Sequence, residues 1–72
     1  MKTLLRILLA DKTIPVGDWD LYAWIINSKP RGITCRHRSS GLMGPTERPT
    51  ASGLSRLLRW IDERESAIVL SA

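Results

Sequence analysis

The apolar residues of the chain fall into separate stretches, and the spacing within each stretch predicts one element. Over residues 3–10, Leu4, Leu5 and Leu8 follow the spacing of a helix, while alternate residues of the same stretch would suit a strand. Leucine favours helix over strand, so we predict a helix and keep the strand as the alternative. Residues 13–16 are predicted to be extended, because the residue before Pro15 avoids the helical region.

The second apolar stretch, residues 18–26, predicts a helix that opens at Asp18. A short acidic residue is a good N-cap, and Asp20 adds negative charge to the first turn. The stretch is apolar nearly all round, which is typical of a helix that is buried or that presents one side to a partner. Tyr22 and Trp24 are therefore the candidate residues of a protein interface.

Residues 31–40 predict a strand or an extended arm. In a strand, Ile33 and Cys35 would face the core while Arg36 and Arg38 point outward together. The following segment, residues 39–52, contains three glycine or proline breaks and predicts a long loop. Long loops inside compact domains are usually functional or mobile, and we expect this one to be mobile.

The last stretch carries the strongest periodic signal. Leucine and isoleucine recur at i, i+3, i+4 and i+7 from Leu54 to Ile61, which predicts a helix over residues 51–65 with Thr50 or Ser52 as its cap. Its last acidic residues oppose the helix dipole, so either the helix continues or those acids have another partner. The β-branched run at residues 67–70 predicts a short final strand.

These elements predict an α+β fold. We expect a single domain over residues 1–72, with two or three helices and a short two- or three-stranded sheet. The one cysteine excludes an internal disulfide, and the usual ligands of a zinc site are missing, so no metal and no cofactor are expected. A core of this size supplies little net stability, and a homodimer is therefore a reasonable expectation.

The composition places the protein among soluble globular chains. Apolar residues make up 43% and charged residues 25% of the sequence, which are globular values. No apolar stretch is long enough to cross a bilayer, and Arg6 interrupts an N-terminal run that is short for a signal peptide. We expect no membrane partner, and the free thiol favours a cytoplasmic location.

The charge is concentrated in the middle of the chain. Residues 1–28 and residues 49–72 each carry three basic and three acidic side chains, whereas residues 29–48 carry five basic side chains and one acidic one. The whole net charge of +4 therefore lies in the central segment. Such a segment is a candidate surface for phosphate or for an acidic protein face, although a solvated loop kept soluble by arginines is an equally good interpretation.

The candidate binding residues combine this basic segment with the outer side of the last helix. Paired arginines bind phosphates or carboxylates, and tryptophan serves both as an interface anchor and as a stacking platform for bases. The candidate residues for nucleic acid or another anionic partner are Arg31, Arg36, His37, Arg38, Arg48, Arg56, Arg59 and Trp60.

Catalysis is not expected. Cys35 and His37 would share one face of a strand and could act as a nucleophile and base or as two metal ligands. A catalytic pair also needs an orienting group and an oxyanion site, which so short a chain can scarcely enclose. We interpret the pair as a buried cysteine beside a surface histidine, and we name no catalytic residue.

Two functions remain open. The first is a small, non-enzymatic regulatory protein that binds nucleic acid through its central basic strand and loop. The second is a protein-interaction module or inhibitor, of the kind that phages and mobile elements encode, which would block a host protein through Tyr22, Trp24 and the loop at residues 41–49. Binding to nucleic acid should weaken steeply with salt, so salt dependence separates the two.

Overall fold

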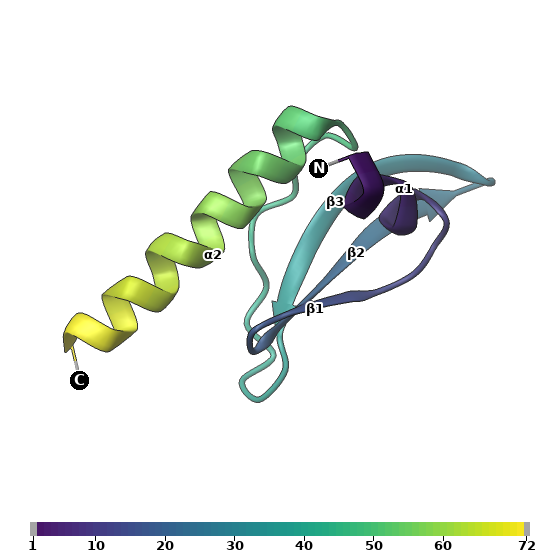
Figure 1. Ribbon diagram of the computed structural model, residues 1–72. Helices are drawn as coiled ribbons and strands as arrows, with labels where there is room; N and C mark the ends of the chain where they lie inside the picture. Colours follow the sequence, from purple (N-terminus) through teal and green to yellow (C-terminus); the bar gives the residue numbers. More distant parts are fainter. Residues whose placement is uncertain (1, 72) are drawn as a thin grey trace.

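A computed structural model describes residues 2–71 of the chain, with side chains over residues 3–65. Two helices and a three-stranded antiparallel sheet follow one another in the order α1 (Lys2–Leu9), β1 (Ile14–Val16), β2 (Trp19–Ile26), β3 (Lys29–His37) and α2 (Ala51–Ser71) (Figure 1). The sheet order is β1-β2-β3, so each strand pairs with the next strand of the chain. The predicted α+β class is confirmed.

The N-terminal stretch is a helix, as predicted. Leu8 is fully buried, Leu4 and Leu5 are partly buried against the same core, and Arg6 is exposed. This is the one-sided burial that a short amphipathic helix needs to be stable, because few internal hydrogen bonds support it. The extended piece predicted at residues 13–16 is confirmed as β1.

The helix predicted over residues 18–26 is wrong, because that stretch is the central strand β2. Trp19, Leu21 and Ala23 are buried and alternate with side chains on the other face, which is the period of a strand. Both faces of β2 are apolar, and this removes the alternation from the sequence pattern. Asp18 does not cap a helix but lies in the turn between β1 and β2.

Two-residue turns connect the three strands. Val16 pairs with Trp19, and Ile26 pairs with Lys29, which leaves Gly17-Asp18 and Asn27-Ser28 as the connections. Gly17 has a positive φ of 58° at the position where type II′ turns place glycine. Asn27 and Ser28 both have positive φ, 54° and 63°, as a type I′ turn requires.

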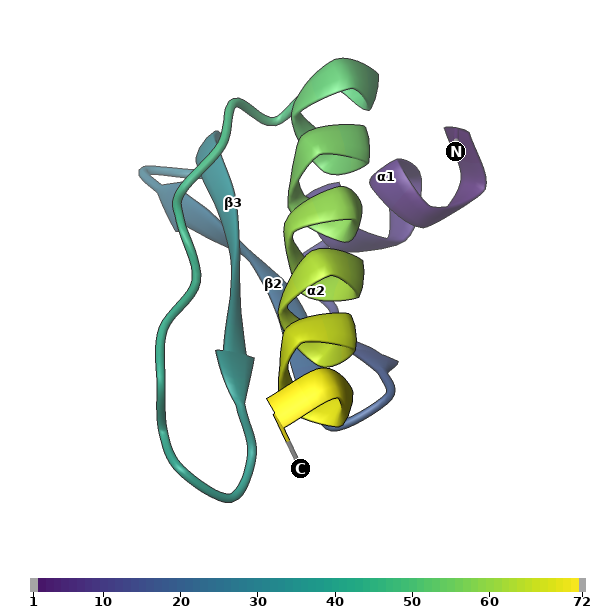
Figure 2. The ribbon, with the colours of Figure 1, turned by 90° about the vertical axis from the view of Figure 1, so that its left-hand side faces the viewer.

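The strand predicted at residues 31–40 is confirmed as β3, with Ile33 and Cys35 in the core. After β3 the chain turns back and runs beside it, as an irregular edge segment over residues 42–47 (Figure 2). The Ile33 and Glu47 backbones exchange two hydrogen bonds of 2.8 Å, and the Gly44 N–H donates to the Cys35 carbonyl at 2.8 Å. The long loop is therefore irregular but is hydrogen-bonded to β3 over residues 42–47.

The predicted C-terminal helix is confirmed and is longer than expected. The Thr50 hydroxyl accepts a hydrogen bond of 3.1 Å from the Gly53 N–H, so Thr50 is the N-cap. Helix α2 continues to Ser71, so the strand predicted at residues 67–70 is wrong. The free edge of β3 is already occupied by the edge segment, and elongating an existing helix adds one hydrogen bond per residue.

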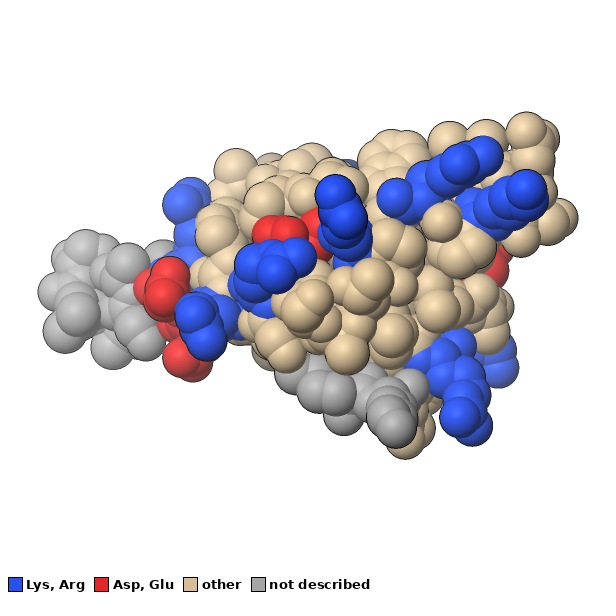
Figure 3. Space-filling model, turned by 90° about the horizontal axis from the view of Figure 1, so that it is seen from above, with Lys and Arg blue, Asp and Glu red and all other residues tan. Residues whose placement is uncertain are grey.

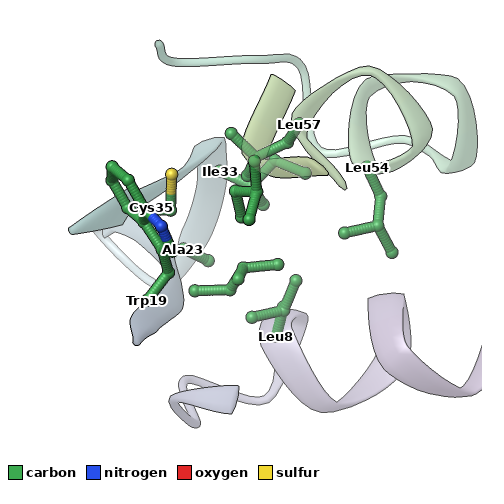
Figure 4. Close-up of a cluster of buried hydrophobic side chains, with 9 residues drawn as sticks. Leu8, Trp19, Ala23, Ile33, Cys35, Leu54 and Leu57 are labelled. Atoms are coloured by element: carbon green, nitrogen blue, oxygen red, sulfur yellow. The ribbon is translucent and has the colours of Figure 1, made fainter. Parts of the chain in front are cut away.

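Both helices cover the same face of the sheet (Figure 2). Leucines of α1 and α2 meet the inward residues of β2 and β3 in one cluster, in which Trp19 is only 1% exposed (Figure 4). The opposite face of the sheet carries no helix, which Figure 2 shows from the side. The edge segment covers the middle of β3 on this side, because Thr34 is fully buried and its hydroxyl donates to the Gly44 and Pro45 carbonyls, whereas Trp24, Ile26 and Arg36 are exposed.

Candidate functional site

The open face of the sheet carries the outward row of β2. Because the residues of a strand alternate, Tyr22 and Trp24 point to the same side, opposite to Trp19 and Leu21. The rings of Tyr22 and Trp24 are neighbours, with centroids 6.3 Å apart and planes at 52°. Trp24 is 47% exposed and Ile26, next to it at the end of the strand, is 52% exposed. Side chains of this size are seldom left so open in a small core-forming strand.

The neighbouring strand β3 adds arginines to the same face. Arg36 pairs across from Asp20, and Gly32 pairs across from Trp24, so both stand in the outward row. Arg36 is exposed, and Arg31 is exposed at the end of the face near the β2–β3 turn. Within residues 3–65, neither arginine forms an ion pair with an acidic side chain. Two guanidinium groups that form no ion pair within residues 3–65 therefore flank the half-buried Tyr22 and the exposed Trp24, with Asp20 as the acidic residue across from Arg36.

A pocket of about 220 Å³ lies beside Trp24. Its lining combines an aromatic ring, aliphatic groups, one guanidinium group and bare backbone, contributed by Trp24, Ile26, Arg31, Gly32 and Thr46. Gly32 has no side chain to lie against the indole of Trp24, and Thr46 of the edge segment lies in the space that such a side chain would fill.

The path of the edge segment beside β3 also requires a glycine at position 32. A Cβ atom at this position would lie 2.9 Å from Cγ2 of Thr46 and 3.1 Å from the Glu47 carbonyl oxygen. The edge segment can therefore approach β3 only because residue 32 is glycine. The same approach brings Thr46 to the wall of the pocket, so the pocket depends on the long loop as well as on the sheet.

Two of the predicted binding arginines are neutralised within the chain. Nε of Arg38 donates to Asp20 at 3.0 Å, and its guanidinium group also bonds the Gly17 carbonyl. Nε of Arg56 donates to Glu47 at 3.1 Å. The arginine side chains of both pairs are about half exposed, so the pairs contribute little to stability, but they reduce the charge offered to a partner.

His37 and Trp60 belong to the inner layer. Both rings pack edge-on against Trp19, with centroids 5.0 Å and 5.2 Å from it. The indole N–H of Trp19 donates to Glu65 at 2.9 Å, which satisfies the one polar atom of this buried ring. The guanidinium carbon of Arg64 lies 5.5 Å from the Trp60 ring centre. This aromatic cluster joins α2 to the sheet and is part of the core.

The predicted site residues therefore divide between two layers. Arg31, Arg36 and the ion-paired Arg38 lie on the side of the open face, whereas Arg48, Arg56 and Arg59 lie at or near the first turns of α2, in the helical layer. Seen from above, basic side chains are spread along the molecule rather than gathered in one patch (Figure 3).

The sequence analysis assigned the aromatic residues of β2 to a protein partner and the arginines of β3 to an anionic partner. Both groups lie on the open face. We define this face by Tyr22, Trp24, Ile26, Arg31 and Arg36. Sequence reasoning missed the pocket residues Ile26, Gly32 and Thr46. The one available signal was the Asn27-Ser28 pair between two apolar runs, which indicates a hairpin.

Cys35 and His37 do share the inner face of β3, but the thiol is fully buried. Burial raises the pKa of Cys35 from 9.0 to about 11, against the lowering effect of its backbone hydrogen bond with Gly44. A protonated thiol is a poor nucleophile and a poor metal ligand. Among the residues whose side chains are described, no three His, Cys, Asp or Glu residues gather as metal ligands would.

Neither α1 nor α2, over the part of the chain that the structure describes, has both the length and the hydropathy of a membrane span. Comparison of the chain with protein-family models, with curated proteins and with solved structures returned no match.

Proposed function

We propose that this protein is a small, non-enzymatic regulatory module that binds nucleic acid through the open face of its sheet. The observation that carries the proposal is the placement of a half-exposed Trp24 between Arg31 and Arg36, neither of which has an acidic partner within residues 3–65. A reduced, buried thiol and such a partner both fit a cytoplasmic protein.

The two kinds of side chain match the two parts of a nucleotide. Guanidinium groups form charge-assisted, often bidentate hydrogen bonds with phosphate oxygens. Exposed aromatic rings stack on bases, and this attraction tolerates any base because each has a π face. A surface that offers both can hold the backbone and the bases of one ligand together.

The helical layer is a poorer candidate for this role. Residues 51–65 carry three arginines and three acidic residues, which cancel, and Arg56 is already paired with Glu47. A neutral helix gains little from the release of counterions, which is the main source of affinity for a nucleic acid backbone. The open face is therefore the surface that favours an anionic polymer.

The test compares two double variants that remove the same charge from opposite layers. Arg31→Ala with Arg36→Ala should weaken binding to a labelled oligonucleotide, measured by fluorescence anisotropy over a range of salt. The slope of log affinity against log salt should become shallower by about 1.4 to 1.8, because about 0.7 to 0.9 is lost for each phosphate contact.

The matched control is Arg6→Ala with Arg59→Ala, which removes two exposed arginines from α1 and α2. We expect it to bind almost as the parent protein does. Equal losses in both double variants would mean that net charge alone drives binding, and absence of binding at low salt by the parent protein would reject the proposal.

A second candidate, a protein-interaction module or inhibitor, is favoured by apolar side chains at the edge of the same face. Leu42 and Met43 are exposed on the edge segment, and the Tyr22 hydroxyl donates to the Met43 sulfur at 3.7 Å. Exposed apolar groups that adjoin one another are typical of protein interfaces. This candidate predicts binding that is insensitive to salt and weakened by Leu42→Ser with Met43→Ser.

A further inference from the structure

We propose that the pocket beside Trp24 receives one unpaired nucleobase, so that the ligand of the open face is single-stranded. This inference rests on the proposed function and narrows it to one class of nucleic acid. Its support is independent of charge: a half-exposed indole lines an open pocket of about 220 Å³ together with Gly32 and Thr46.

A base can stack on a protein ring only if one of its own faces is bare. Within a duplex, the neighbouring base pairs cover both faces of each base, whereas the bases of a single strand can be splayed apart. Trp24 is half-exposed at the surface of the sheet, and its cross-strand partner Gly32 adds no side chain of its own, so that Thr46 of the edge segment forms the opposite wall of the pocket. The indole is therefore available to a separate, flat, apolar group such as an unstacked base.

The remaining pocket residues fit the same ligand. Ile26 and Thr46 provide aliphatic walls, and Arg31 brings a positive charge to the pocket. The phosphate group of a bound nucleotide can thus contact Arg31 while its base contacts Trp24.

The face is long enough for more than one nucleotide. Arg31 and Arg36 are five residues apart along β3, which corresponds to roughly 16 Å of extended strand. Tyr22 stands between them, 6.3 Å from Trp24, and offers a second ring. A single strand that follows β3 would meet an arginine near each end of the face and two rings between them.

The first experiment compares a labelled oligothymidylate and an oligouridylate with a DNA duplex of equal length, at equal salt. We expect the parent protein to bind the single strands more tightly. Trp24→Ala should weaken binding to the single strands by about 5- to 150-fold, the range that loss of one stacked base produces, and Trp24→Tyr should retain most of the affinity. Binding to the duplex should change little in either variant.

Thr46→Leu provides a second, independent variant. Thr46 is exposed, so a larger side chain is tolerated at this position and fills the pocket without altering Trp24 or any charge. We expect it to lower single-strand affinity while circular dichroism shows an unchanged fold. A Thr46→Ser variant, which leaves the pocket open, is the matched control.

Intrinsic fluorescence gives a readout that a structural role of Trp24 would not produce. Stacking of thymine should quench the emission of the exposed Trp24, and this quench should disappear in Trp24→Phe but persist in Trp60→Phe, whose ring is partly buried in the core.

The outcomes separate the two proposals. Equal affinity for single strands and duplex, together with no effect of Trp24→Ala, would overturn the base pocket while leaving nucleic acid binding in place. If the parent protein binds neither single strands nor the duplex at low salt, the proposed function itself is overturned. If the substitutions at Trp24 and Thr46 weaken binding to single strands but not to the duplex, both proposals are supported.

Discussion

Gly44 lies at the closest contact between the edge segment and the core. A Cβ atom on this residue would overlap the sulfur of Cys35 and lie 3.1 Å from Cζ3 of Trp60. Gly44 does not have a positive φ, so its backbone conformation alone would accept alanine. The substitution Gly44→Ala therefore tests packing rather than backbone strain.

The structure allows the cost to be estimated. Cys35 is fully buried on β3, and its short side chain has no free space in which to swing aside. The edge segment would have to move away from the core, and such overpacking costs about 1–3 kcal/mol. Loss of the 2.8 Å hydrogen bond from the Gly44 N–H to Cys35 adds about 1 kcal/mol. We expect Gly44→Ala to lower the free energy of unfolding by about 2–4 kcal/mol.

Cys35→Ala provides the compensating change, because it removes the atom that the new methyl group meets. Alone it should cost about 1 kcal/mol of lost apolar burial. If the reasoning holds, the double variant regains about 2 kcal/mol relative to the sum of the single changes, measured by urea unfolding followed by tryptophan emission. Purely additive losses would show that the sulfur of Cys35 is not the obstacle and would refute the packing argument.

Three further predictions concern the turns, the helix start and the buried thiol. Ser28→Gly should raise stability by about 0.5–1 kcal/mol in urea unfolding, because Ser28 has a positive φ that costs an L-residue more than glycine. Gly53→Ala should lower the melting temperature although it adds helix propensity, because its Cβ would overlap the backbone carbonyl of Arg48; a higher melting temperature would contradict this. Burial raises the pKa of Cys35 to about 11, so the stability that depends on the protonated thiol is complete below about pH 8 and is lost as the pH rises through 11; the free energy of unfolding should fall between these two pH values by about 2 kcal/mol more in the parent protein than in Cys35→Ala.

Local patterns predicted the two helices and β3 because each of them separates apolar from polar residues. In α2, the leucines at helical spacing face the sheet and Thr50 caps the first turn, so one short window contains all the information. The continuation of α2 beyond Glu65 was not predicted. The β-branched run there favours a strand locally, but whether it forms one depends on a free sheet edge, which only the tertiary structure reveals.

The sequence predicts only in part which arginines of the site are free of ion pairs. The basic character of residues 29–48 is a property of the sequence, and Arg31 and Arg36 do stand in the open. The two neutralised arginines pair with acids 18 and 9 residues away, contacts that no local pattern encodes. The pocket is similarly non-local, because Thr46 reaches it through the return of the long loop.

The strand that the sequence pattern concealed is also the strand that carries the candidate site, and one physical cause accounts for both. A strand with one solvent-exposed face and one buried face alternates between polar and apolar residues, and it is recognised by that alternation. β2 lacks it because Tyr22, Trp24 and Ile26 occupy positions that face away from the helices. Apolar side chains on an open face weaken the pattern and are stabilised only when something covers them. An ambiguous apolar run in a small α+β protein is therefore a reason to look for a binding face, and in this chain the flanking arginines are the basis for proposing an anion as the covering ligand.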